Sequence, residues 1–160
     1  MHANGIKWVQ EIVGCLLYCA HTADNKLLGD LSEIGSQQAA ATERKNQAIA
    51  QLINYVATYP NNSIIYQASD MILAAHADAE YLNVRKARSR IGAHIMLVEN
   101  EPVQCCNGPI LTIAQIIKYG MSSAAKAELS KLFITAKNMV PIHQALIEMI
   151  WPPPKTPIQN

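Results

Sequence analysis

The spacing of apolar residues changes twice along this 160-residue chain, and these changes limit how the chain can fold. Residues 1–60 place apolar side chains three and four apart, as on one face of a helix. From residue 63 the apolar runs are β-branched or alternate with other residues, which is typical of strands. After Gly120 the helical spacing returns. The order predicts an α+β fold in which helices pack on an antiparallel sheet.

Three helices are expected first, over residues 6–23, 25–35 and 41–59, with Asp24 as a candidate cap of the second. The apolar stripe of the first helix is expected to consist of Trp8, Ile12, Cys15, Leu16 and Cys19. Because these helices carry no cluster of acids, histidines or cysteines, they predict a packing unit.

The strands are expected over residues 63–67, 71–81, 92–99 and 107–119. A helix over residues 122–139 follows them, and Pro141 is expected to start or kink a further helix. The last five residues, TPIQN, resemble the start of another strand.

The chain is sparsely charged: 16% of its residues carry a charge, against about a quarter in an average soluble domain. Either neighbouring protein covers part of the surface, or the surface simply has few charges. With a net charge of +1, contact with nucleic acid would need a local basic cluster. The densest cluster is VRKARSR, residues 84–90, which is either a solvated loop or a phosphate contact. Its cations are Arg85, Lys86, Arg88 and Arg90.

The four cysteines show no metal-binding spacing and indicate reduced thiols in an intracellular, cytoplasmic protein. The N-terminus lacks the layout of a signal peptide. No apolar run approaches the ~20 residues that span a bilayer, so no membrane contact is expected.

Two acids could share a site if the helix after Gly120 packs on the sheet. Hydrolysis of a phosphodiester by two metal ions needs several carboxylates in one cleft, with the ions about 3.5–4 Å apart. Asp78 lies at the polar end of the most apolar strand run, and Glu128 lies in the first turns of the following helix. In the simpler interpretation, Asp78 only ends a strand and Glu128 only stabilises the helix N-terminus. His76 is expected to be a half-buried sheet residue and Glu80 to face solvent.

Three stretches together resemble the ribonuclease H domain of copia-type LTR retrotransposon polyproteins. They are AAHADAEYL at residues 74–82, KARSRIGAHIMLV at residues 86–98 and MSSAAKAEL at residues 121–129. The earlier IVGCLLYCAHTA and LINYVATYP resemble the helical segment that connects reverse transcriptase to ribonuclease H in that family. The implied organisation is a helical connection segment, residues 1–60, and a ribonuclease H-like domain, residues 61–160, truncated at its C-terminal end.

The resemblance implies a mixed five-stranded sheet with packed helices, and Mg²⁺-dependent cleavage of the RNA strand in an RNA–DNA hybrid, with Mn²⁺ as an alternative ion. By position, Asp78 and Glu128 match the family's strand acid and helix acid, which serve as catalytic residues and metal ligands. Arg85, Lys86, Arg88 and Arg90 match its basic turn, where they contact the hybrid or shape the loop. The implied partner is the reverse transcriptase part of the polyprotein, in the cytoplasm or within a virus-like particle.

Two departures from the family pattern predict impaired catalysis. Lys126 stands where relatives usually carry a glutamate, and a cation so near Glu128 weakens metal binding. The family's next strand carries an aspartate after a segment resembling TPIQ, whereas this chain ends at Asn160. Little or no nuclease activity is therefore expected. The alternatives are a non-catalytic structural or protein-interaction module on the same fold, and a degenerate fragment without selected function.

Overall fold

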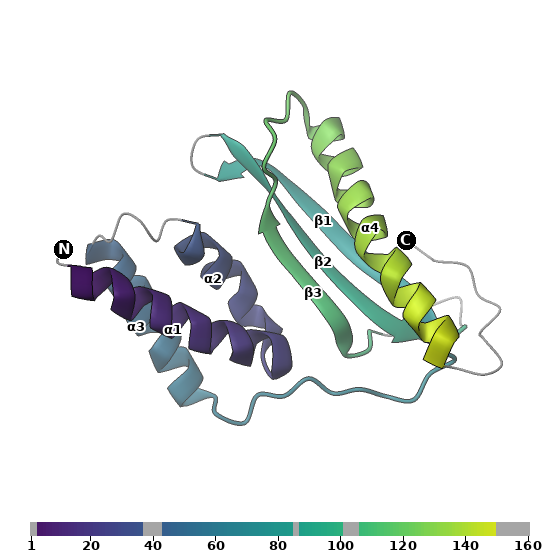
Figure 1. Ribbon diagram of the computed structural model, residues 1–160, viewed down its shortest axis with the longest axis horizontal. Coiled ribbons are helices and arrows are strands. Elements are labelled where there is room, and N and C mark those ends of the chain that lie inside the picture. The colour runs from purple at the N-terminus through teal and green to yellow at the C-terminus, as the bar shows by residue number, and fades with distance from the viewer. Residues whose placement is uncertain (1–2, 37–42, 85–86, 101–105, 150–160) are drawn as a thin grey trace. The chain divides into compact units, whose positions relative to one another are not determined.

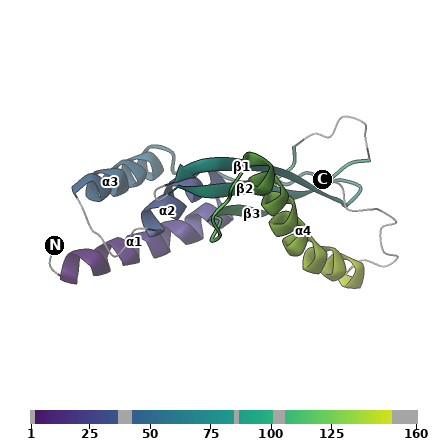
Figure 2. The same ribbon diagram turned by 90° about the horizontal axis from the view of Figure 1, so that it is seen from above.

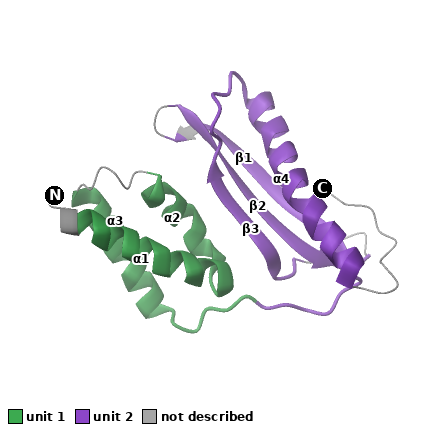
Figure 3. Ribbon diagram, in the orientation of Figure 1, with its two compact units in different colours: residues 1–64 green, residues 65–160 purple. Residues whose placement is uncertain are grey.

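The computed structural model describes residues 3–36, 43–84, 87–100 and 106–149 of the chain. The chain forms two compact units, residues 1–64 and 65–160, which Figure 3 colours separately. Each unit is described by itself. The described residues form four α-helices and one antiparallel sheet of three strands, which confirms the α+β class.

The first unit is helical. It contains α1 (Ala3–Thr22), the short 3-10 helix η1 (Asn25–Leu27), α2 (Leu28–Gly35) and α3 (Glu43–Thr58). The predicted stripe of α1 was wrong by one position, because Trp8 is 44% exposed whereas Val9, Val13 and Ala20 are buried. Both sets have helical spacing, so spacing alone could not separate the buried face from its neighbour.

Asp24 links the helices of this unit. Its side chain caps η1 by accepting a hydrogen bond from the backbone N–H of Lys26 at 3.2 Å. Its second oxygen accepts a hydrogen bond from Asn62 Nδ2 at 2.6 Å, and the same amide lies 3.1 Å from the Tyr55 hydroxyl. Partial burial, and then the hydrogen bond to Asp24, raise the pKa of Tyr55 above its ordinary value. The predicted cap therefore also ties α3 and the residues after it to η1.

The second unit is a three-stranded sheet with one long helix. The strands are β1 (Ile72–Val84), β2 (Arg88–Val98) and β3 (Pro109–Ile116), hydrogen-bonded in the order β1-β2-β3 and antiparallel throughout. Helix α4 (Ala124–Met149) runs across one face of this sheet (Figure 1 and Figure 2). The parallel strand that a mixed sheet would need is not among the described strands.

Alternation along the strands divides the sheet into two faces. The face under α4 buries an apolar core around Met139, and this core consists of Leu73, Ala75, Ala93, Ile95, Ile113 and Met139. On the opposite face, one end is apolar, with Ile72, Ala74, Met96 and Val98 buried. Further along that face the side chains become polar and exposed, beginning at His76 and His94.

Two predicted elements differ from the structure. Residues 63–67 form no strand: Ile65 and Tyr66 are exposed, and the Asn107 side chain bonds both backbone groups of Gln67, at 2.8 and 3.0 Å. A side-chain amide here satisfies backbone groups that would otherwise need a neighbouring strand. Pro141 starts no new helix, because α4 continues through it to Met149. The predicted strand at TPIQN lies outside the described residues.

Candidate functional site

Asp78 lies on the sheet face that points away from α4. Its neighbour Ala77 packs against the core under α4, and consecutive strand residues point to opposite faces. Asp78 is paired with Gly92 of β2, and its side chain is exposed. Its carboxylate accepts a hydrogen bond from the backbone N–H of Ala79 at 2.8 Å. The acid is therefore solvated and held by local backbone.

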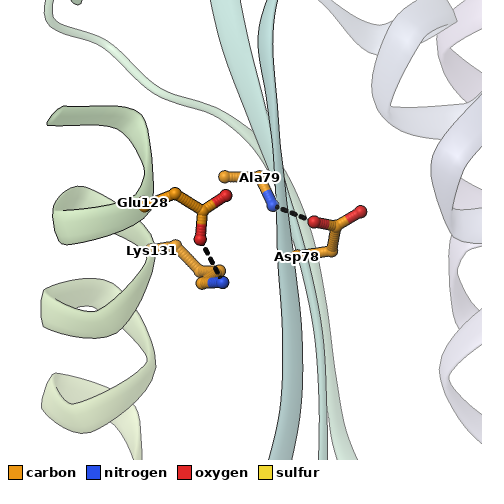
Figure 4. Close-up of polar contacts among 4 residues, drawn as sticks. All are labelled: Asp78, Ala79, Glu128 and Lys131. Atoms are coloured by element: carbon orange, nitrogen blue, oxygen red, sulfur yellow. Dashed lines mark hydrogen bonds and ion pairs between the residues drawn. The ribbon is translucent and has the colours of Figure 1, made fainter. Parts of the chain in front are cut away.

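Glu128 lies on α4, on the other side of the sheet. Ser123 caps this helix by accepting a hydrogen bond from the Lys126 backbone N–H at 3.2 Å, which places Glu128 in the second turn. Glu128 forms an ion pair with Lys131, one turn further along. Figure 4 shows Asp78 directed away from Glu128, with the sheet between them.

The two acids therefore do not fit a shared magnesium site. Two ions about 3.5–4 Å apart need carboxylates that converge from one side, and the sheet keeps these two apart. The Glu128 carboxylate also forms an ion pair with Lys131, whose positive charge disfavours a metal cation there. Within the described ranges, no three acids, histidines or cysteines are grouped so that they could hold a metal ion.

Only part of the predicted basic cluster can be placed. Arg85 and Lys86 lie outside the described residues. Arg88 and Arg90 are half-buried at the start of β2, in a strand and not in a loop. Arg90 is paired with Glu80 across the strands, two positions from the Asp78–Gly92 pair, so alternation places it on the Asp78 face. Arg90 therefore shares a face with Asp78, whereas Glu128 lies on the opposite side of the sheet.

The same face carries a histidine pair that the sequence reasoning did not join. His76 of β1 lies directly opposite His94 of β2, and both are exposed. His94 Nδ1 lies 3.1 Å from the Thr112 hydroxyl of β3. Partial burial, and then His76, lower the pKa of His94 below its ordinary value. The register shifts between Glu80 and Val84, so the pairing nearest the turn, Val84 with Arg88, would not by itself have predicted that residue 76 lies opposite residue 94.

Comparisons with protein families, with curated proteins and with solved structures find no match to this chain. In the part of the chain that the structure describes, no helix is both long and apolar enough to cross a membrane.

Proposed function

We propose that this chain is a ribonuclease H-like module of a copia-type retrotransposon polyprotein that acts as a protein-interaction unit and has no nuclease activity of its own. The position of Asp78 and Glu128 on opposite faces of the sheet carries this proposal. The sequence resemblance supports the family. The separation of the acids favours the non-catalytic alternative over two-metal hydrolysis.

An apolar stripe on α4 supports the interaction role. Leu129, Phe133 and Val140 are 67%, 68% and 60% exposed, and their spacing of four and seven residues puts them on one side of the helix. Leu132 extends this stripe, which we call the outer stripe. Another helix can pack such a ridge into its own groove. The proposed partner is a helix of the reverse transcriptase part of the same polyprotein, which would cover the outer stripe and account for the low charged fraction of 16%.

The first test is cleavage of a labelled RNA–DNA hybrid by the purified chain in Mg²⁺ or in Mn²⁺. We expect no cleavage above that of a protein-free blank, and no difference between the parent chain and the variants Asp78→Asn and Glu128→Gln. Metal-dependent cleavage that both variants abolish would show that the acids act together, and the nuclease interpretation would replace ours.

The second test is binding of the separately expressed reverse transcriptase part, measured by calorimetry. The double variant Leu129→Asp/Phe133→Asp places two charges in the outer stripe, and we expect it to weaken binding at least ~10-fold because buried charges must be desolvated. Ala124→Asp adds a charge at the exposed first residue of α4, where the helix dipole favours an acid, and is the control expected to bind normally. Equal binding by the parent chain, the double variant and Ala124→Asp would exclude the outer stripe as the interface.

A further inference from the structure

Two histidines are held side by side on the sheet face away from α4. His76 and His94 are direct cross-strand partners, so their Cβ atoms lie about 4.5–5.5 Å apart. Ala75 and Ala93, each one position away, pack in the core under α4, and this fixes both imidazoles on the opposite face. Both side chains are exposed and can be reached by an ion from solvent.

A third strand orients one of the two rings. Thr112 is the β3 partner of His94, and its hydroxyl lies 3.1 Å from His94 Nδ1. When Nδ1 carries the proton and donates it to this hydroxyl, Nε2 keeps a free lone pair. Imidazoles that bind metals almost always donate their second N–H to an acceptor in this way.

We propose that His76 and His94 form a two-imidazole binding site for a divalent transition-metal ion of the Zn²⁺ class, with Thr112 as a positioning residue. Imidazole nitrogen suits Zn²⁺, Cu²⁺ and Ni²⁺, whereas Mg²⁺ prefers oxygen ligands. Two ligands leave two positions of a tetrahedral ion for water or for a donor from another molecule. This site does not depend on the proposed interaction role, and it uses neither Asp78 nor Glu128.

The test is calorimetric titration of Zn²⁺ into the untagged full chain, with all four cysteines changed to serine so that thiols do not compete. We expect this parent to bind one Zn²⁺, and His76→Gln or His94→Gln to weaken binding at least ~10-fold. Thr112→Val removes only the hydroxyl that orients His94, and the expected loss is also about 10-fold. His21→Gln removes an exposed histidine of α1 and is the matched control expected to bind like the parent.

Several results would overturn the site. One is a parent chain that binds no Zn²⁺, and another is binding that survives in the double variant His76→Gln/His94→Gln. A response to Mg²⁺ of the same strength, or a loss in His21→Gln as large as in His76→Gln, would also contradict it. Melting curves recorded without metal show whether each variant is folded, so that a loss of binding is not mistaken for unfolding.

Discussion

Changing Ile95 to alanine is expected to lower the free energy of unfolding of the sheet unit by about 3–4 kcal/mol. Ile95 is fully buried in the middle of β2, between its partners Ala75 and Leu111, and it belongs to the core around Met139. Removal of three buried carbon atoms costs their transfer free energy and also leaves a cavity under α4, because β2 is held by strands on both sides and cannot collapse into it.

Native-state hydrogen exchange of the β2 amides is the measurement, since it reports the opening of this unit separately from the helical unit. Ile110→Ala is the matched control. It makes the same chemical change in β3 at a residue that is partly exposed, and we expect a loss within about 1 kcal/mol. If the two variants lose equal stability, the cost reflects strand propensity and not burial in the core around Met139.

The sequence could predict the strands of this unit because each of them buries at least one alternating face. Residues 72–81 became most of β1, whereas residues 63–67 are richer in β-branched side chains but pair with none of the described strands. Strand propensity describes how well a side chain fits a half-buried sheet, so it adds little stability to a segment that has no neighbouring strand. Pro141 was expected to start or kink a helix; it starts none, because α4 continues through it over 26 residues despite the hydrogen bond that proline cannot donate.

The sequence could not predict whether Asp78 and Glu128 lie on the same side of the sheet. A shift of one residue along the strand moves a side chain to the other face. Had Ala77 and Asp78 exchanged places, the acid would point toward α4 and Glu128. The apolar run Ile72–Ala75 is buried on both faces, so the sequence gives no signal as to which face the helix covers. The histidine pair could not be predicted either, because His76 and His94 are partners only in the exact register of β1 on β2.

The polar groups of the sheet unit gather on the face that α4 does not cover. His76, Asp78 and Arg90 lie there at successive positions of the β1–β2 ladder. The exposed side of α4 carries the apolar outer stripe instead. One unit therefore presents two surfaces of different chemistry, on the two sides of a single sheet. The proposed metal ion would bind on the first surface and the proposed partner helix on the second.

Changing Asp24 to alanine is expected to destabilise the helical unit by roughly 2–3 kcal/mol. The side chain is only 7% exposed. Its loss removes the cap of η1, which costs about 1 kcal/mol. It also leaves the amide of Asn62 without its carboxylate acceptor, and an unsatisfied, partly buried donor costs about 1–3 kcal/mol. The Tyr55 hydroxyl offers that amide one remaining partner, so the two costs are not simply additive.

Fluorescence of Trp8 during urea unfolding follows this unit, provided that Trp151 is changed to phenylalanine so that Trp8 is the single tryptophan, and that excitation is chosen to avoid the tyrosines. Asp24→Asn keeps a capping oxygen of the same reach but loses the charge, and we expect it to recover about half of the loss, because asparagine caps helices as well as aspartate does. Asp30→Ala removes an exposed acid from the first turn of α2 and is the control, with an expected loss of at most about 1 kcal/mol. If Asp30→Ala proved as destabilising as Asp24→Ala, charge near the helix termini would explain the effect, and the link from η1 to Asn62 would contribute nothing to stability.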